Sequence, residues 1–355
     1  MVRAVKWRGR DRLLDPLLAG ATLLVALPNL LLDRSPPMIL LVLVGPLLSC
    51  VRLGVRCTLL LCCWSAALGL AMGMVNTTMT PFVFGVRYGG LLAGCAVAHY
   101  AARQRCTLQS ALAEAREVTR VTQEAILRPI SRNLAGTHVC TRYHCAARES
   151  VVGGDLYDVA LTPYGLRLLV GDVRGHGLEA LRLTAATVAG FRDLAHTASD
   201  LPGLTLALND RIGPELGPED FVTAVLAEFA PGEVRLVNCG HPAPLRAGRR
   251  IEFLEPFAPT TPLGLGPDPR QYRVGFQPGD RLLVYTDGLT EARSADGTLF
   301  PLLAEATRAL CQPLPDDVLR SLHDRVLLHT GGRPADDLAL VLCQSAEALV
   351  PLLPR

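Results

Sequence analysis

The sequence predicts an α+β domain that is preceded by an all-helical membrane region. Three observations lead to this prediction. Half of the 355 residues are apolar and only 19% are charged, a composition too apolar for a wholly soluble protein. The apolar residues are concentrated in residues 13–100, and charged and turn residues return after residue 101. In this second part, strand-like runs, two of them joined as an antiparallel hairpin, occur with helix-like runs, which is typical of an α+β domain.

The charge and cysteine patterns exclude several kinds of chemistry. Lys6 is the only lysine, so a Gly-Lys phosphate loop, a Schiff-base lysine and a polybasic lysine tail are excluded. The net charge is +2 and the arginines are dispersed among acids, so we expect no nucleic-acid partner. The eleven cysteines contain no C-x-x-C pair, which is typical of a reducing compartment.

Four apolar runs predict a four-span transmembrane region over residues 13–100. The runs are residues 13–32, 38–51, 57–75 and 82–100. A spanning helix needs roughly 20 apolar residues, and the second run is the weakest by this measure. The alternative is the buried helical core of a soluble protein, which four successive runs favour less.

The positions of the basic residues predict the orientation of these spans. Basic residues fill the N-terminal segment 1–12, and Arg52 and Arg56 separate the second run from the third. Arg103 and Arg105 follow the fourth run. Because Lys and Arg are retained on the cytoplasmic side, we expect a multi-pass protein of the cell membrane with both termini in the cytoplasm.

Residues 101–130 are predicted to form a helical linker that ends near Pro129. A weak heptad seam runs along it: Leu108, Leu112, Ala115, Thr119, Thr122 and Ile126. A solvated connector and a dimerising signalling helix both fit this seam. A homodimer through the linker is therefore an open alternative.

Residues 131–345 are predicted to form the α+β domain, followed by a tail at 346–355. Strand-like runs occur at 139–146, 165–170, 221–229, 233–238, 281–286 and 337–343. Helix-like runs occur at 177–195, 203–212 and 316–328. The three residues between 229 and 233 form a short turn, which predicts an antiparallel hairpin.

Four acids stand beside glycines or at predicted strand ends: Asp155, Asp172, Asp287 and Asp336. Singly, each Asp-Gly or Gly-Asp pair is typical of a turn. Four carboxylates brought together would repel one another, so their convergence requires a cation. Oxygen-rich sites suit Mg²⁺ or Mn²⁺.

These acids belong to a series of short motifs in a fixed order. The motifs are residues 153–158 (GGDLYD), 171–177 (GDVRGHG), 238–242 (NCGHP), 262–265 (PLGL), 278–280 (PGD), 285–292 (YTDGLTEA) and 336–340 (DDLAL). In order and spacing, the chain resembles the SpoIIE/RsbU-type branch of the PP2C-like (PPM) serine/threonine phosphatases over about residues 143–343. The resemblance implies an α-β-β-α sandwich of two antiparallel sheets flanked by helices.

The resemblance also implies a catalytic site with two Mn²⁺ or Mg²⁺ ions. Asp155, Asp172, Asp287 and Asp336 would be the metal-ligating carboxylates, and the Val173 carbonyl would complete one metal shell. Asp155 and Asp172 would be the main catalytic acids, with Asp172 bridging both ions. A water molecule held between two cations can attack phosphorus in line without a covalent nucleophile on the protein.

Two further residues of the GDVRGHG motif are candidate substrate contacts. Larger PP2C enzymes place a His two residues after the bridging Asp, as a candidate general acid. This chain has Arg174 there, and His176 follows two residues later. The general acid is therefore unassigned.

The implied function is a membrane-anchored, metal-dependent phosphoprotein phosphatase in a bacterium. It would act on phosphoserine or phosphothreonine of a cytoplasmic regulatory protein, of the anti-sigma factor antagonist type. The alternative is a weakly active or inactive PP2C-like scaffold in partner switching. A degenerate module would be expected to lose metal ligands first, and here all four acids are present.

Some other polar residues have competing interpretations. His138, Cys140, His144 and Cys145 are close in sequence, but a strand would place Cys145 on the face opposite the other three, so we do not predict a zinc site. His241 is interpreted as structural. Asp158 and Asp337 are candidates only for supporting the metal ligands.

Overall fold

The computed structural model describes residues 39–75, 80–145, 153–175, 177–332, 334 and 336–345. The chain divides into two compact units, Met1–Arg116 and Glu117–Arg355. The first predicted span, the N-terminal segment 1–12 and the tail at 346–355 lie outside the described residues.

The described part of the first unit is helical. It contains a 3₁₀ turn, η2 (Ile39–Leu43), and the helices α2 (Val44–Arg52), α3 (Val55–Val75) and α4 (Pro81–Ile126). Two stretches are long and apolar enough to cross a membrane, Val55–Val75 and Pro81–Ala115. Their most apolar windows are only 39% and 17% buried, whereas the core helix of a soluble protein would be mostly buried.

The structure therefore supports the predicted spans to different degrees. The third and fourth runs are full-length apolar helices, and the second run is an apolar helix of only Leu40–Arg52, shorter than a usual span. The fourth run and the predicted linker form a single helix, α4, because neither Gly nor Pro occurs between residues 95 and 126. Helix α4 ends three residues before Pro129, whose ring disfavours helical backbone at the preceding residue.

The second unit contains two sheets in which every pair of named strands is antiparallel. The six-stranded sheet has the order β1 (Ser131–Leu134), β2 (Thr137–His144), β11 (Leu338–Ser345), β10 (Arg281–Tyr285), β7 (Leu245–Ala247), β8 (Ile251–Phe253). The five-stranded sheet has the order β3 (Asp155–Thr162), β4 (Gly165–Val173), β5 (Val222–Ala230), β6 (Glu233–Cys239), β9 (Tyr272–Gly275).

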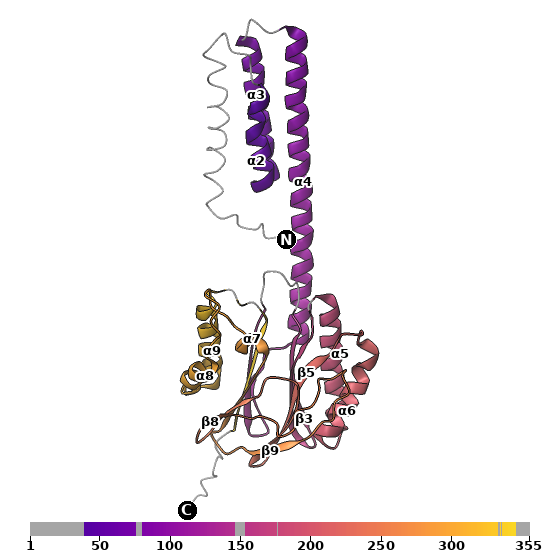
Figure 1. Cartoon of the computed structure of the whole chain (residues 1–355), viewed down its shortest axis with the longest axis vertical. Helices are drawn as coiled ribbons and strands as arrows, with labels where there is room; N and C mark the ends of the chain where they lie inside the picture. The colour runs from indigo at the N-terminus through magenta and orange to yellow at the C-terminus, as the bar shows by residue number, and fades with distance from the viewer. Residues whose placement is uncertain are drawn as a thin grey trace, which may run out of the picture. The chain divides into compact units, whose positions relative to one another are not determined.

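Helices cover the outer face of each sheet (Figure 1). Helices α5 (Leu178–Leu194) and α6 (Leu201–Ile212), with the short η3 (Gly213–Glu215), lie on the five-stranded sheet. Helices α8 (Leu302–Leu310) and α9 (Pro315–His329) lie on the six-stranded sheet, and α7 (Asp287–Thr290) is a single turn after β10. One apolar core includes residues of both sheets and a second lies under α8 and α9. The predicted α-β-β-α sandwich is confirmed.

The predicted strands and helices of this unit are present within a few residues of their expected bounds. The hairpin between β5 and β6 is also confirmed. The sequence prediction missed β1, β3, β7, β8, β9, α7 and α8. Strand β3 escaped detection because seven of its eight residues are buried or partly buried, so polar and apolar residues do not alternate along it.

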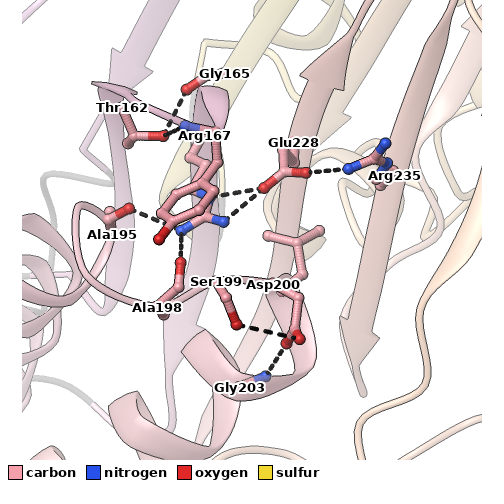
Figure 2. A network of polar contacts seen from close by, with 12 residues as sticks. Thr162, Gly165, Arg167, Ala195, Ala198, Ser199, Asp200, Gly203, Glu228 and Arg235 are labelled. Carbon is pink, nitrogen blue, oxygen red and sulfur yellow. Dashed lines mark hydrogen bonds and ion pairs between the residues drawn. The ribbon is translucent and has the colours of Figure 1, made fainter.

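A buried ion pair fixes the helical layer to the five-stranded sheet (Figure 2). Arg167 of β4 is fully buried and donates to Glu228 Oε2 of β5 at 2.9 and 2.6 Å. Its remaining nitrogen donates to the carbonyls of Ala195 and Ala198 at 2.7 and 2.6 Å. The other oxygen of Glu228 accepts from Arg235 at 2.8 Å. Since both charges are satisfied, the pair positions the loop between α5 and α6 on the sheet.

Candidate active site

Three acids from separate strand ends meet at one edge of the sandwich. Asp155 begins β3 and pairs directly with Asp172 near the end of β4, so the two side chains point to the same face of the sheet. Asp287 begins α7, just after β10 ends. One carboxylate oxygen from each of the three lies within 4.8 Å of the others.

Asp336 lies at the rim of this group. It is exposed, two residues before β11, and lies outside the set of three. Its negative charge nevertheless raises the pKa of both Asp172 and Asp287, so its carboxylate is close to theirs. The structure thus brings the four predicted acids to one edge, three of them in a tight group.

Two glycines allow this close approach. A Cβ on Gly153 would lie 0.9 Å from Asp337 Oδ2. A Cβ on Gly154 would lie 2.3 Å from the Val173 carbonyl oxygen and 2.7 Å from Asp172 Oδ1. The Val173 carbonyl and the Asp172 carboxylate therefore lie side by side over Gly154, and a side chain at either glycine would displace the acidic edge.

The acids raise one another's pKa values. Burial, and then the charge of Asp172, raise the pKa of Asp155 well above its ordinary value. Burial, followed by the charges of Asp287, Asp336 and Asp337, raises the pKa of Asp172 to about 8. Burial also raises the pKa of Asp287. Several carboxylates that cannot all ionise together, with only oxygen donors, fit hard divalent cations such as Mg²⁺ or Mn²⁺.

Neighbouring hydroxyl groups hold the acids in place. Thr286 Oγ1 donates to Asp155 Oδ2 at 2.6 Å and accepts from the Ala339 amide at 2.9 Å. Tyr143 donates to Asp337 Oδ2 at 2.9 Å, and burial, then the charge of Asp337, raise the pKa of this phenol. Sequence reasoning assigned no role to Thr286 or Tyr143. The only signal for Thr286 was its place beside Asp287 in the motif.

A pocket of about 390 Å³ adjoins the acids. Asp172, Asp287, Thr223, His241, Thr290 and Glu291 are among the residues that line it. His241 Nε2 is 3.1 Å from the Tyr285 carbonyl. A carbonyl only accepts, so Nε2 carries the proton and Nδ1 accepts from Thr223 at 2.9 Å. Burial lowers the pKa of His241 to about 4, so its ring is neutral at pH 7 and supports a structural role.

The structure describes one of the two predicted substrate contacts, Arg174. Arg174 follows β4, and its guanidinium donates to the Glu219 carbonyl at 2.7 Å and to Glu219 Oε2 at 3.2 Å. The Arg174 side chain is half exposed. His176 lies outside the described residues. A role of either residue toward substrate stays a prediction.

Comparisons with known proteins agree with this architecture. The family model for Stage II sporulation protein E (SpoIIE) matches residues 162–345, more than half of the chain. The match includes Asp172, Asp287 and Asp336 and begins after Asp155, which the pairing of β3 with β4 adds to the site.

Two solved structures are similar. The RsbU and RsbW domains of a Mycobacterium tuberculosis protein are 26% identical, with a TM-score of 0.52 and coverage of 61% of this chain and 61% of that chain. The SiaA-PP2C domain of Pseudomonas aeruginosa is 19% identical, with a TM-score of 0.56 and coverage of 68% and 98%; this likeness shows the fold alone. The likenesses show a PP2C-like fold, and the family match shows that the chain belongs to the SpoIIE family.

Proposed function

We propose that this chain is a membrane-anchored, metal-dependent phosphatase that removes phosphate from serine or threonine of a cytoplasmic regulatory protein. One observation carries the proposal: carboxylate oxygens of Asp155, Asp172 and Asp287 converge within 4.8 Å, and two of these acids also line a pocket of about 390 Å³. A cation bound by these acids would offset their repulsion, and a phosphorylated side chain would bind in the adjoining pocket.

The residues present fit two Mn²⁺ or Mg²⁺ ions. Asp155, Asp172, Asp287 and Asp336 would hold them, together with the Val173 carbonyl. Bound there, the ions would lower the pKa of a water molecule and neutralise the phosphate oxygens. Asp172 is the acid proposed to be shared between the ions, and one of its oxygens lies within 4.8 Å of oxygens of both Asp155 and Asp287.

The remaining residues would position this site. Thr286 restrains Asp155 through the 2.6 Å hydrogen bond, and His241 and Thr223 form one wall of the pocket. Arg174 would contact the substrate phosphate only after leaving Glu219. His176 is proposed for the same role on sequence grounds.

The membrane proposal is a four-span region with both termini in the cytoplasm. The two long apolar helices, with mean hydropathies of 1.9 and 1.4, support it. So do the arginines that flank the apolar runs on one side. This topology would place the catalytic site in the cytoplasm.

A direct test measures phosphate release by the full-length chain purified in detergent. We expect release from a phosphoserine protein with Mn²⁺ or Mg²⁺, no release with EDTA, and recovery when metal is restored. Asp268→Asn, which alters an exposed acid outside the site, should retain activity. A folded protein that is inert with both metals on several phosphoproteins would instead support the second candidate, a partner-switch scaffold.

We propose an anti-sigma factor antagonist as the substrate class. Membership of the SpoIIE family and the likeness to a protein with RsbU and RsbW domains support this proposal. The test compares the phosphoproteomes of a deletion strain and an Asp172→Asn strain with the parent strain. One serine or threonine phosphosite should rise in both strains, and no such rise would contradict the proposed substrate class.

A further inference from the structure

A second group of potential metal ligands lies under the first turn of α9, on the outer face of the six-stranded sheet. His138 and Cys140 are two residues apart on β2 and therefore share a face. Asp316 comes from the first turn of α9. A ring nitrogen, the sulfur and a carboxylate oxygen lie within 4.8 Å of one another. None of these residues belongs to the acidic site.

The His138 ring is oriented as a metal-ligating histidine usually is. Its Nδ1 is 2.9 Å from Asn133 Oδ1. An amide oxygen only accepts, so Nδ1 carries a proton, and Nε2 lies on the side of the ring that points away from Asn133. Metal-bound histidines commonly donate their other ring N–H to such an acceptor.

The Nε2 atom faces a carboxylate without a hydrogen bond. It is shielded from solvent and has no hydrogen-bond partner among the described residues. Asp316 Oδ2 is 3.6 Å away, which is too long for a hydrogen bond but suits two ligands of one ion. If Nε2 carries no proton, its lone pair and the carboxylate repel each other at this distance, and a metal cation between them would remove the repulsion.

The third donor is the Cys140 thiol, which makes only a long hydrogen bond. Cys140 is fully buried, and its Sγ is 3.7 Å from the Leu342 carbonyl. Burial, and then the charge of Asp316, raise the pKa of this thiol to about 12, so it keeps its proton at pH 7 without a cation. The charge of Arg281 opposes this rise. Its guanidinium donates to the carbonyls of Leu310, Gln312 and Pro313 and to Gln344 Oε1.

We propose that His138, Cys140 and Asp316 bind one zinc ion, with water as a fourth ligand. Nitrogen, sulfur and oxygen donors together suit tetrahedral Zn²⁺ and not Mg²⁺ or Mn²⁺. Binding would replace the thiol proton, so affinity would rise with pH. The ion would link β2 to the first turn of α9. The cluster sits apart from the acidic site, so the proposal does not depend on phosphatase activity.

The test uses Co²⁺ as a spectroscopic probe of the full-length, metal-stripped chain in detergent. A Co²⁺–thiolate bond gives a near-ultraviolet charge-transfer band, which the all-oxygen acidic site cannot produce. We expect the band to grow as Co²⁺ is titrated up to three equivalents, enough to fill this site and the two positions of the acidic site, and to be lost on addition of Zn²⁺. Cys140→Ser should abolish it, and Asp316→Asn should weaken Co²⁺ binding about tenfold or more.

Matched controls separate this site from other cysteines and from the catalytic acids. Cys343→Ser changes a thiol on the neighbouring β11 that is also fully buried, and it should keep the band. Asp172→Asn should keep it as well. Asp316 is half exposed, so its variant tests the site without altering the core. A folded parent without the band, or a band that survives Cys140→Ser, would overturn the proposal.

Discussion

Asp172 lies close to acids from both sheets. It pairs with Asp155 across the ladder from β3 to β4, and the charges of Asp287 and Asp336 raise its pKa to about 8 after burial. Its carboxylate also lies beside the Val173 carbonyl, over Gly154. The Asp172 side chain is therefore both a proposed catalytic residue and a main source of electrostatic repulsion among the acids when no metal is bound.

We predict that Asp172→Asn abolishes turnover and does not destabilise the metal-free protein. Without metal, the native carboxyl group retains a proton between about pH 4 and pH 8, whereas the unfolded one has lost it. The native state then binds more protons, so the stability of the parent falls as pH rises across this window. Asn has no proton to lose at this position, so this fall should be smaller in the variant.

The measurement is thermal unfolding in EDTA at pH 8, with phosphate release assayed in Mn²⁺. The variant should melt at the same temperature as the parent or higher; a gain of about 1 kcal/mol corresponds to roughly 2–4 °C. Asp268→Asn provides the control for loss of an exposed acid. Near-parental activity in Asp172→Asn would disprove the two-metal assignment.

At the scale of elements, the last turn of α4 is connected to the acidic edge. Gln123 of α4 is buried and donates to the Tyr143 hydroxyl of β2 at 2.5 Å. Tyr143 donates in turn to Asp337 at 2.9 Å, next to Asp336. Gln123, Tyr143 and Asp337 therefore form a chain of hydrogen bonds through which a movement of the end of α4 can displace the neighbouring Asp336, a proposed metal ligand.

We predict that the linker part of α4 controls activity through the rotational position of its heptad seam. The seam positions Thr119 and Thr122 are small and polar, which would leave two registers of a dimer nearly equal in energy. Thr119→Leu with Thr122→Leu should favour one register and change phosphate release in native membranes. Insertion of four residues after Glu117 should rotate everything that follows and change activity too.

An insertion of seven residues at the same place is the matched control. It nearly preserves the heptad phase and should leave activity closer to that of the parent than the insertion of four. All three variants would be compared at equal expression. If none of them alters activity, α4 is a passive tether.

At the scale of the whole molecule, the chain combines an apolar helical unit with a PP2C-like unit. The concentration of apolar residues before residue 101 predicts a division into two parts, and the boundary between the two compact units falls after Arg116 in the chain. The domain bounds at residues 12, 100, 130 and 345 stay predictions. The four-span arrangement and the homodimer also stay proposals, supported by α3 and α4 and by the weak heptad seam.

The sequence by itself predicted the α+β fold class and singled out the four acids by their positions beside glycines and at strand ends. The resemblance to a family added the sandwich architecture and the proposed roles of these acids. The fold class follows from local information, because strand and helix periods and turn residues are set by near neighbours in the chain. For this reason the sequence predicts the strands that precede Asp172 and Asp287. Strand β3 was missed, because burial on both faces removes the alternation that marks a strand.

Only the tertiary structure decided which distant side chains meet. The register of β3 against β4 places Asp155 beside Asp172, and the bond from Thr286 to Asp155 joins the two sheets. Likewise, His138, Cys140, His144 and Cys145 are close in sequence without predicting a metal site, whereas the packing of α9 brings Asp316 to His138 and Cys140. Such contacts depend on strand pairing and helix packing over long separations, which no local pattern encodes.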